Sequence, residues 1–512
     1  NKRIIRHEIS RAEALQQFQD DPYKVDLINR MPEDTNISMY SQGDFTDLCR
    51  GPHVESTKLL KNFKLLKHSG AYWKGDKNNK VLQRIYGVCF PTDTELEAYL
   101  QVLEEAKERD HRKLGKDLKM FLFSETVGSG LPMWLPNGFT VRRLLSDYIM
   151  EKEIALGYEH VLTPSVASTK LYEVSGHLAH YQEDMFPIME RDGDSYVLRP
   201  MNCPEHMIIY KASLHSYRDL PVRIAEIAHD FRFEASGALT GIERSRSFTQ
   251  NDSHIFLRPD QIAEEIKNVT KLILDVYNDF GFKDYSFRLS LRDLNNTDKY
   301  FGNDDLWTRS ENELREVLKE MKVPYYEAEG EAAFYGPKID VQVKSALGHD
   351  VTLSTIQLDY QLPERFELEY VNKDNQKVRP VVIHRAILGS LDRFVAFLLE
   401  ETKGVLPLWL APLQVEVIPV NSEAHGDYAS KINRALKREG IRSHLDDRNE
   451  KLGYRIREAQ MNKVPIQIVV GNRDIENETV TVRTYGSKEE VSHSFKDYLN
   501  QLVEQIAQKS RN

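Results

Sequence analysis

The sequence predicts an α+β protein of several domains, with a large central domain of mixed strands and helices and a smaller α/β domain at the carboxy-terminal end. Three observations support this. The chain has 512 residues, more than one domain usually holds. A densely charged stretch with helical periodicity, residues 93–120, separates a strand-rich first segment from the central region. From residue 404 onward, strand-like and helix-like runs alternate, which is typical of an α/β domain.

The composition is that of a globular protein without a membrane span. Apolar residues make up 40% and charged residues 29% of the chain, both ordinary values. No run approaches the roughly 18 apolar residues that a spanning helix needs, and no amino-terminal stretch resembles a signal peptide. The three cysteines cannot form a disulfide framework, which suits a reducing cytoplasm. The net charge of −10 argues against extensive coating of nucleic acid but leaves room for a local basic surface.

The first segment, residues 1–92, contains short strand-like runs separated by turns: NISMYSQGDFTDLCRGPHV, FKLLKHSGAYW and VLQRIYGVCF. The chain begins at Asn1, without a Met and already within patterned sequence, so we expect it to be part of a longer protein. In residues 93–120, apolar residues recur at helical spacing and the rest is charged. This predicts a long, largely exposed connecting helix. Its apolar positions are Leu96, Tyr99, Leu100 and Leu103.

The central region, residues 121–403, is predicted to mix helices and strands. The run GFTVRRLLSDYIMEKEIALGYEHVLTPSV predicts a helix that stops near Gly157 and a short strand that ends at Pro164. DQIAEEIKNVTKLILDVYNDFGF predicts a second helix, and YSFRLSLRD alternates as a strand does. VRPVVIHRAILGSLDRFVAFLLEET predicts a strand, a glycine-containing turn and an apolar helix. The apolar residues of the second helix are Ile262, Ile266, Val269, Ile273 and Val276.

The last block, residues 404–512, predicts a small doubly wound α/β domain. Its successive runs are LQVEVIPV, DYASKINRALKREG, SHLDDR, KLGYRIREAQMNK, PIQIVVG, TVTVRTY and KDYLNQLVEQIAQ. Basic residues interleave with short apolar runs in DDRNEKLGYRIREAQMNKVPIQIVVGNRD. On charge pattern alone, this favours an ordinary solvated helix face.

The stretch from Met201 to Phe256 contains an arginine, Arg232, between two phenylalanines in a strand-like pattern. Activation of an acid by ATP adds negative charge to the α-phosphate, and a fixed guanidinium there would supply bidentate, charge-assisted hydrogen bonds. Glu234 lies two residues on, and we expect it on the same face of the strand. There it could accept a hydrogen bond from a neutral group such as an adenine amino group.

The GALTG loop that follows lets the chain turn, so we expect Arg244 and Phe248 to return antiparallel to Arg232. Phe248 could stack under a base. Arg393, one turn into the helix after Gly389–Ser390, could meet a terminal phosphate. A surface hairpin with salt-bridged arginines explains the same residues. The chain has no Walker-type loop and no GxGxxG run, so the common phosphate-binding folds are not indicated.

Cys203, His254 and His384 are candidate metal ligands. A thiolate with two imidazoles suits Zn²⁺ and leaves a fourth position for a substrate. Their wide separation along the chain also fits a lone buried cysteine with two core histidines. A second thiol–imidazole pair, Cys49 and His53, lies beside Asp47 in the first segment. That pair could bind a metal, act as a nucleophile with its base, or position a water.

Three signatures in order carry a family resemblance: GFTVRRLLSDYIMEKEIALGYEHVLTPSV, FRFEASGALTGIERSRSF and IHRAILGSLDRFVAFLLEE. With them the chain resembles the class II aminoacyl-tRNA synthetases. The runs TDLCRGPHV, GAYWKGD, LQRIYG, VSGH, RPMNCPEHM, FTQNDSHIF, AFYGPKID and IQLDYQLPERFEL make it similar, within that class, to the threonyl-tRNA synthetase family. The resemblance covers essentially the whole chain. We expect the chain to lack the amino-terminal part of the family.

The resemblance implies an antiparallel catalytic sheet with flanking helices at 121–403. It also implies the carboxy-terminal part of an editing domain at 1–92, a linker helix at 93–120 and an anticodon-binding α/β domain at 404–512. The implied activity is ligation of threonine to tRNA(Thr) through threonyl-adenylate, with ATP, Mg²⁺ and one Zn²⁺ per subunit, in a cytoplasmic homodimer. A synthetase paralogue that makes an adenylate without charging tRNA, and a nucleic-acid-binding regulator with an inactive core, are the alternatives. The intact carboxy-terminal block argues against the first, and the retained arginines and zinc ligands argue against the second.

The resemblance also assigns roles to single residues. The zinc ligands would be Cys203, His254 and His384, which separate threonine from the nearly isosteric valine but exclude serine poorly. Catalytic roles fall to Arg232, Arg393, Lys338 and His177, although an ordinary ion pair and a loop histidine explain the last two equally well. Substrate or ATP would contact Met201, Glu234, Arg244, Phe248, Gln250, Asp252, Tyr335 and Gln357, with Asp252 orienting the amino group. The chain departs from the family at Thr352, where a glutamine is common. His206 and His229 are expected to be structural.

The editing pocket of the family matches Lys24, Tyr40, Asp47, Cys49 and His53, where a water that hydrolyses Ser-tRNA(Thr) would be positioned. The family's HxxxH pair does not occur before Cys49, so we expect this chain to edit poorly. Anticodon contacts would fall to Asn449, Arg457, Asp474 and Arg483, since single-stranded loops are recognised through splayed bases, hydrogen bonds and arginine stacking.

Overall fold

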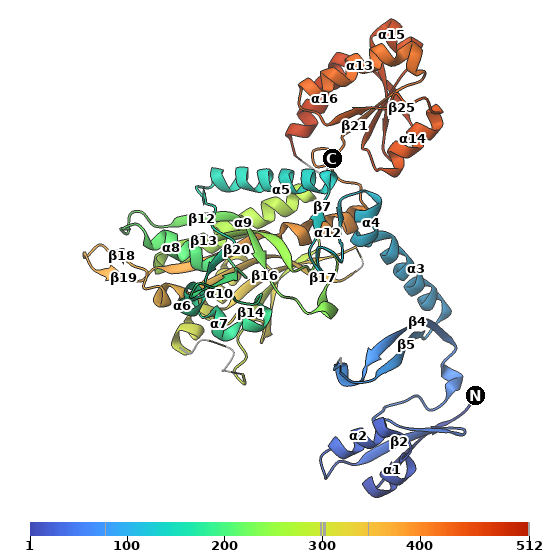
Figure 1. Cartoon of the computed structure of the whole chain (residues 1–512), viewed down its shortest axis with the longest axis vertical. Helices are drawn as coiled ribbons and strands as arrows, with labels where there is room; N and C mark the ends of the chain where they lie inside the picture. The colour runs from blue at the N-terminus through green and yellow to red at the C-terminus, as the bar shows by residue number, and fades with distance from the viewer. Residues whose placement is uncertain (77, 297–299, 301–303, 347, 510–512) are drawn as a thin grey trace. The chain divides into compact units, whose positions relative to one another are not determined.

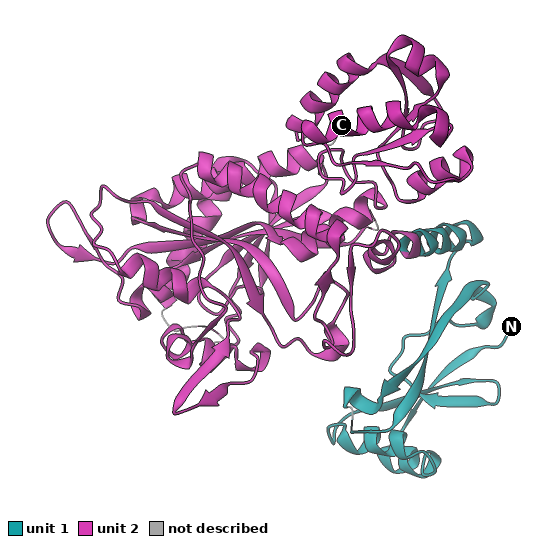
Figure 2. Cartoon of the chain, turned by 45° about the horizontal axis from the view of Figure 1, so that its top comes forward, with its two compact units in different colours: residues 1–106 teal, residues 107–512 magenta. Residues whose placement is uncertain are grey.

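The computed structural model describes residues 1–512 except 77, 297–299, 301–303, 347 and 510–512. The described chain forms two compact units, residues 1–106 and 107–512 (Figure 2). None of the helices in the described part is long and apolar enough to cross a lipid bilayer.

Unit 1 contains a three-stranded antiparallel sheet in the order β1-β2-β3 and a separate hairpin, β4-β5. Its elements are β1 (Ile4–Ile9), α1 (Arg11–Gln17), α2 (Pro22–Arg30), β2 (Ile37–Gln42), β3 (Phe45–Leu48), β4 (Asn62–Tyr72), β5 (Val81–Phe90) and the first part of α3 (Asp93–Arg109). The expected strands are present, but the two helices α1 and α2 were not predicted. Ser10 caps α1 in a reciprocal capping box with Glu13, and Asp21 caps α2.

The expected single connecting helix over 93–120 is corrected to two helices. α3 ends at Arg109 and α4 (His111–Asp117) begins after Asp110, whose side chain accepts a hydrogen bond from the backbone N–H of Arg112 at 2.8 Å. The short carboxylate of Asp110 satisfies a free N–H at the start of α4, which favours a new helix over continuation of the old one.

The central part of unit 2 is built on an eight-stranded sheet in the order β15-β14-β16-β17-β20-β13-β12-β8 (Figure 1). All neighbouring pairs are antiparallel except β12–β8 and β14–β15. The strands are β8 (Glu159–His160), β12 (Val222–Phe231), β13 (Ser247–Leu257), β14 (Tyr285–Leu291), β15 (Tyr325–Glu329), β16 (Lys338–Lys344), β17 (Asp350–Asp359) and β20 (Val381–Ser390). Short strands lie outside this sheet: β6 (Phe121–Leu122), β7 (Met133–Trp134), β9 (Val166–Ser168), β10 (Met189–Arg191), β11 (Asp194–Leu198), β18 (Tyr370–Val371) and β19 (Lys377–Val378). The predicted antiparallel sheet with flanking helices is confirmed.

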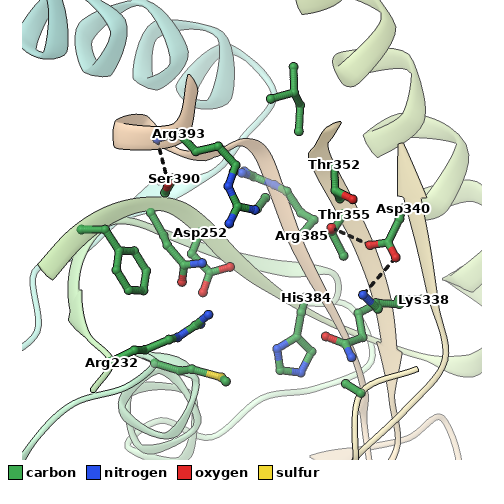
Figure 3. Close-up of a pocket in the computed structure, with 18 of the residues that line it drawn as sticks. Arg232, Asp252, Lys338, Asp340, Thr352, Thr355, His384, Arg385, Ser390 and Arg393 are labelled. Carbon is green, nitrogen blue, oxygen red and sulfur yellow. Dashed lines mark hydrogen bonds and ion pairs between the residues drawn. The ribbon is translucent and has the colours of Figure 1, made fainter. Parts of the chain in front are cut away.

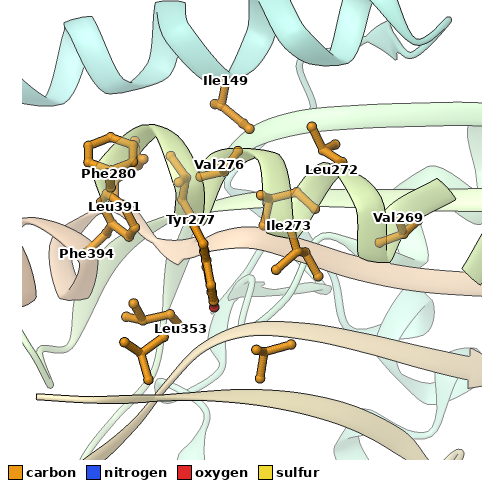
Figure 4. Packing of buried hydrophobic residues seen from close by; sticks show 14 of the residues in the cluster. Ile149, Val269, Leu272, Ile273, Val276, Tyr277, Phe280, Leu353, Leu391 and Phe394 are labelled. Atoms are coloured by element: carbon orange, nitrogen blue, oxygen red, sulfur yellow. The ribbon is translucent and has the colours of Figure 1, made fainter. Parts of the chain in front are cut away.

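The flanking helices are α5 (Pro136–Ala155), α6 (Thr169–Ser175), α7 (His177–His180), α8 (Cys203–Lys211), α9 (Ile262–Phe280), α10 (Asp304–Met321), α11 (Gln361–Arg365) and α12 (Leu391–Thr402). α9 forms the helix predicted from the run at 260–282, and its five expected apolar positions are all buried. Figure 4 shows its side chains packed between Ile149 of α5, Leu353 of β17 and Phe394 of α12. Burying this face holds α9 against the sheet and fixes β20 and α12, which carry the site.

The carboxy-terminal part of unit 2 is an α/β fold with a mixed sheet, order β22-β21-β23-β24-β25. β21 is parallel to β22 and β23, while β24 and β25 run antiparallel. The elements are β21 (Val415–Pro419), α13 (Ser422–Arg438), β22 (Ser443–Leu445), α14 (Leu452–Met461), β23 (Ile466–Val470), α15 (Asn472–Asn477), β24 (Thr479–Thr484), β25 (Glu490–Ser494) and α16 (Phe495–Ala507). Helices α13 and α16 lie on one side of the sheet and α14 on the other (Figure 1). The α/β prediction is confirmed, with α15 and β25 added.

Candidate active site

The site lies over β13, β16, β17 and β20, with Arg232 just beyond the end of β12, and encloses a cavity of about 450 Å³. Figure 3 shows Arg232, Arg393 and His384 pointing into it from different elements. Thirteen residues with predicted roles line this one cavity: Met201, Cys203, Arg232, Glu234, Arg244, Phe248, Gln250, Asp252, Tyr335, Lys338, Gln357, His384 and Arg393. Two others, His254 and His177, are buried outside the lining.

The candidate metal ligands Cys203, His254 and His384 come together although they are far apart in sequence. Cys203 begins α8, whereas His254 and His384 are directly paired residues on β13 and β20. One ligand atom from each lies within 4.8 Å of the others, and all three side chains are buried. Antiparallel pairing places opposite side chains on the same face of the sheet, so the register of two strands brings the imidazoles together.

Each imidazole uses one nitrogen in a hydrogen bond, which fixes the direction of its other nitrogen. His384 Nε2 lies 2.8 Å from Asp359 Oδ2, and His254 Nδ1 lies 2.8 Å from His206 Nδ1. His254 Nε2 is buried and has no hydrogen-bond partner in the described part of the chain. An unpartnered buried nitrogen beside a thiol is costly unless something binds it, so these residues fit a zinc ion.

The electrostatic surroundings agree with a cation site. Burial, and then the carboxylate of Asp252, raise the pKa of the Cys203 thiol well above its ordinary value. Burial, and then the nearby His384, lower the pKa of His254 well below its ordinary value, so His254 stays neutral. A neutral imidazole is the form that binds a metal, and the surplus of carboxylates favours a bound cation.

Arg232 follows the end of β12, and its guanidinium lies over two rings, 5.0 Å from the centre of Phe248 and 5.8 Å from that of Tyr181. Arg393 lies in the first turn of α12, where the side chain of Ser390 caps its backbone N–H at 3.1 Å. Within the described residues, neither arginine forms an ion pair with a carboxylate. Each Nε donates to a backbone carbonyl, Arg232 to Pro200 O and Arg393 to Glu243 O, both at 3.3 Å. The remaining guanidinium N–H groups can donate to phosphate.

The hairpin around Arg232 differs from its expected form. β12 ends at Phe231, so Glu234 lies in the loop and not on a shared strand face. Its carboxylate accepts a hydrogen bond from Arg244 Nε at 2.8 Å. Arg244 therefore matches the alternative of a salt-bridged arginine, while Phe248 does lie on β13, opposite Asp230. The non-repetitive backbone of the loop places Glu234 and Arg244 together, which periodicity cannot foresee.

A bulge in β20 aims the start of α12 at the cavity. Gln250 pairs with Ser390 but Asp252 pairs with Ala386, so β20 carries extra residues between them. The side chain of Asn251 accepts hydrogen bonds from the backbone N–H groups of Ile387 and Leu388, at 3.3 and 3.4 Å. This satisfies the backbone groups that the bulge leaves unpaired.

The residues proposed for the amino-acid pocket surround the metal ligands. Asp252 lies with one carboxylate oxygen 3.8 Å from His254 Nε2, and burial raises its pKa. The ring centre of Tyr335 is 5.0 Å from that of His384. Gln357 is directly paired with His384, and its amide donates to Gly336 O at 3.4 Å.

Lys338 lines the cavity and forms an ion pair with Asp340 at 2.9 Å (Figure 3). Burial alone would raise the pKa of Asp340, but Lys338 and Arg288 hold it below its ordinary value. Thr352 also lines the cavity, and its hydroxyl accepts a hydrogen bond from Gln342 at 2.8 Å. Sequence reasoning missed Asp340, together with Thr355, Arg385 and Ser390, because no pattern marks them as cavity residues.

His177 is not a loop histidine. It begins α7 and is fully buried, with Nδ1 hydrogen-bonded to Ser175 Oγ at 2.7 Å and its ring against Phe334. Burial, and then the charge of Arg232, lower its pKa to about 3. Because the imidazole of His177 is neutral, buried and absent from the cavity lining, it is better suited to packing than to chemistry.

The second thiol–imidazole site lies within unit 1. Cys49 Sγ is 3.0 Å from His53 Nε2, and the ring of His53 lies edge-on to Tyr40 with centroids 4.4 Å apart. Lys24 forms an ion pair with Asp47 at 2.8 Å, and this bond raises the pKa of Lys24. Tyr40 is directly paired with Asp47 across β2 and β3, so these contacts bring the five predicted editing residues near one another. Gly51 has φ +68°, and a Cβ there would lie 2.0 Å from the Tyr40 hydroxyl, so only glycine fits.

The predicted anticodon residues differ in how far they are free to bind. Asn449 and Arg457 are exposed, the latter on α14. Arg483 donates to Glu490 at 2.6 Å. Asp474 is buried, where it accepts hydrogen bonds from Gly471 N at 3.0 Å and from Thr479 Oγ1 at 3.1 Å. Asp474 is thus engaged in holding α15.

Comparisons with known proteins follow this architecture. Residues 186–402 match the tRNA synthetase class II core domain (G, H, P, S and T). Residues 414–505 match an anticodon binding domain, and residues 37–86 match the threonyl and alanyl tRNA synthetase second additional domain. The fold and the cavity are those of a class II aminoacyl-tRNA synthetase.

Two similar proteins indicate which member of the class II synthetases this chain resembles. The chain is 58% identical over 512 residues to a threonine–tRNA ligase of Staphylococcus carnosus, covering all of this chain and 79% of that protein. It is equally identical over 507 residues to one from Staphylococcus aureus strain JH9, covering 99% of this chain and 79% of that protein. A solved structure of the RNA binding domain of threonyl-tRNA synthetase from Cryptosporidium parvum is also similar. It has 35% identity and a TM-score of 0.74, and covers 79% of this chain and 99% of that one. The chain belongs to the threonine–tRNA ligase family.

Proposed function

We propose that the cavity binds threonine and ATP together and is where threonyl-adenylate forms. The observation that carries this is the pair Arg232 and Arg393, two guanidinium groups that form no ion pair with a described carboxylate and share one cavity with the Cys203, His254 and His384 group. The threonine carboxylate attacks the α-phosphorus of ATP, and pyrophosphate leaves. Arg232 binds the α-phosphate, where charge builds up, and Arg393 binds the terminal phosphate. Mg²⁺ enters with ATP and neutralises the phosphates.

The amino-acid end of the cavity is proposed to be the metal site. A zinc ion held by Cys203, His254 and His384 would take the amino group and side-chain hydroxyl of threonine as ligands, which valine cannot match. Asp252 lies beside this position and accepts a hydrogen bond from the amino group. Met201, Gln250, Tyr335 and Gln357 shape the pocket. Phe248 stacks against the base, and Glu234, Arg244 and Lys338 contribute to nucleotide binding or transfer. His177, which is buried against Phe334, is proposed to pack beneath this region and not to touch the substrates.

The carboxy-terminal part of unit 2 is proposed to bind the anticodon of tRNA(Thr). Exposed Arg457 on α14 and Asn449 support this most, whereas Asp474 is occupied by its own loop. Replacing Arg457 with Ala should raise KM for tRNA roughly 10-fold, because each such contact contributes about 1–3 kcal/mol. ATP–pyrophosphate exchange should not change, and loss of exchange would indicate a structural residue.

In unit 1, Cys49, His53, Lys24, Tyr40 and Asp47 are proposed to surround the water that hydrolyses Ser-tRNA(Thr). Without the HxxxH pair of the family, hydrolysis by this chain is expected to be slow.

We also propose the domain limits 1–92, 93–120, 121–403 and 404–512.

The protein is proposed to act as a cytoplasmic homodimer. α5, the helix of the first signature, exposes Phe139 at 59% and Ile154 at 57%, which suits a two-fold interface. Three free cysteines suit a reducing compartment. Light scattering of the purified chain tests the dimer, and a monomer at micromolar concentration would contradict it.

Threonine-dependent ATP–pyrophosphate exchange, followed by charging of tRNA(Thr), tests the whole proposal. A ligase performs both reactions. An adenylate-forming paralogue performs only the exchange, and a regulator with an inactive core performs neither.

A further inference from the structure

A chain of buried polar groups runs behind His254. Glu226 on β12, His206 on α8 and His254 on β13 are all fully buried. His206 Nε2 lies 3.1 Å from Glu226 Oε2, and His206 Nδ1 lies 2.8 Å from His254 Nδ1. His206 thus contacts a carboxylate on one side and a candidate metal ligand on the other.

Glu226 is held as a carboxylate by several donors. Thr163 donates its backbone N–H to Oε1 at 3.0 Å and its hydroxyl to Oε2 at 2.8 Å. Arg199 Nη2 donates to Oε1 at 3.3 Å and Asn202 Nδ2 donates to Oε2 at 3.1 Å. Burial alone would raise the pKa of Glu226, but these groups and His206 lower it to about 2. An ionised carboxylate only accepts hydrogen bonds, so it fixes where the neighbouring protons lie.

Only one placement of the protons on the His254 and His206 ring nitrogens lets His254 bind a metal through Nε2. A metal-bound imidazole is neutral and carries its proton on the other nitrogen, so with Nε2 as ligand His254 must donate from Nδ1. His206 must then accept at its own Nδ1. A neutral His206 that accepts at Nδ1 carries its proton on Nε2, which is the atom that faces Glu226.

We propose that His206 is a positioning residue that, with Glu226, sets the tautomer of His254 and presents its Nε2 lone pair to a bound metal. This rests on the proposed metal site. His206 and Cys203 lie on one helix, one turn apart, so α8 supplies a ligand and also the group that orients a second ligand. The unpartnered His254 Nε2 is the atom this arrangement leaves free.

Glu226→Gln tests the proton arrangement directly. Arg199 and the backbone N–H of Thr163 can only donate, so they hold the amide oxygen at the Oε1 position. The amide nitrogen then takes the Oε2 position and donates to His206 Nε2. There the Thr163 hydroxyl can accept in place of donating, and the Asn202 amide turns so that its Oδ1, which has no partner among the described residues, replaces its Nδ2 donor. The proton of His206 moves to Nδ1, and that of His254 moves to Nε2, where it blocks the metal. His206→Ala removes the acceptor altogether.

The experiment measures zinc affinity of the metal-stripped full chain by competition with a chromophoric chelator, with thermal midpoints of the metal-free proteins alongside. Loss of an outer-shell partner weakens metal binding about 10- to 100-fold, and both variants should fall in this range. His229→Gln is the matched control, since His229 also lies on β12 but bonds Ser247 Oγ at 2.9 Å and no metal ligand. Its zinc affinity should equal that of the parent.

The outcomes separate the two proposals. Zinc binding by the parent with unchanged affinity in both variants overturns the role of His206 and leaves the metal site intact. A parent that binds no zinc overturns the metal site, and this inference with it. If one variant fails to fold, the other decides. Lower thermal midpoints with parental zinc affinity would make His206 a packing residue only.

Discussion

The two thiol–imidazole sites of this chain have the same chemical groups and different surroundings. Cys203, His254 and His384 are buried, and each imidazole is oriented by a further side chain. Cys49 is half-buried and His53 is exposed, joined by a single contact of 3.0 Å. A thiol and imidazoles that are desolvated and oriented suit a metal, whereas an open pair suits work on water or a large substrate.

The backbone explains the difference. His254 and His384 lie on paired central strands, where side-chain direction is fixed by the sheet. Cys49 and His53 follow the end of β3 in a loop around Gly51. A sheet gives fixed geometry at the cost of burial, and a loop leaves access for a bulky ligand such as the end of a tRNA.

The largest expected difference between the sites is in metal content. Cys203→Ala should remove the zinc, about one ion per chain in the parent, and abolish threonine-dependent exchange while ATP still binds. Cys49→Ala is the matched control and should keep both zinc and exchange. Elemental analysis and an ATP-binding titration give the two readings. Zinc retained in Cys203→Ala would place the metal elsewhere.

Arg232→Ala distinguishes the role proposed for the arginine from that proposed for the metal ligands. Removing a group that stabilises transition-state charge costs about 10²- to 10³-fold in kcat, and exchange should fall by that factor. Zinc content should match that of the parent because Arg232 touches no proposed ligand. Exchange within a factor of a few of the parent rate would refute the role given to Arg232.

Burial in unit 2 should also appear as a pH dependence of stability. The folded pKa of His177 is about 3, against an ordinary value of 6.5, so the unfolded chain binds its proton first as the pH falls. The stability is fully present above pH 6.5 and declines below it, by about 1 kcal/mol between pH 7 and 5.5. His177→Phe keeps a ring against Phe334 and should lessen this decline. Thermal midpoints of the transition that includes unit 2 measure it, and equal pH slopes in parent and variant would count against the buried, neutral state.

The smallest expected effect is in unit 1. His53→Ala should leave ATP–pyrophosphate exchange within about twofold of the parent, because His53 belongs to unit 1 and does not line the cavity of unit 2. Deacylation of Ser-tRNA(Thr) should be slow in parent and variant alike. Rapid deacylation by the parent would show that Cys49 and His53 suffice without the HxxxH pair.

Local sequence patterns predicted much of this fold. The remaining features depend on loop, cap and strand-pairing geometry that local patterns do not contain. The helix predicted over 260–282 follows from its apolar periodicity, and the strand that carries His384 follows from its β-branched run. The position of Glu234 off the strand and the break at Asp110 depend on loop and cap geometry that periodicity does not contain. Helix α1 had a readable signal in Ser10 and Glu13 that strand-like neighbours obscured.

The candidate site was predictable mainly through resemblance. Nothing in their spacing connects Cys203 with His254 and His384, because only the register of β13 and β20 and the start of α8 bring them together. Asp340 and His206 lie in the runs AFYGPKID and RPMNCPEHM, but no sequence pattern gave either residue a role at the site. Their roles depend on which side chains the sheet turns toward them.

Because His254 is directly paired with His384, the candidate metal site forms only when β13 and β20 pair in the correct register. Successive side chains of a strand point to opposite faces, so a slip of β20 by one residue would turn His384 away from His254. A misregistered sheet would retain its strands and much of its apolar burial, and it would lack the three-residue metal group. Uptake of the proposed zinc ion during refolding would therefore measure correct strand alignment, separately from recovery of secondary structure.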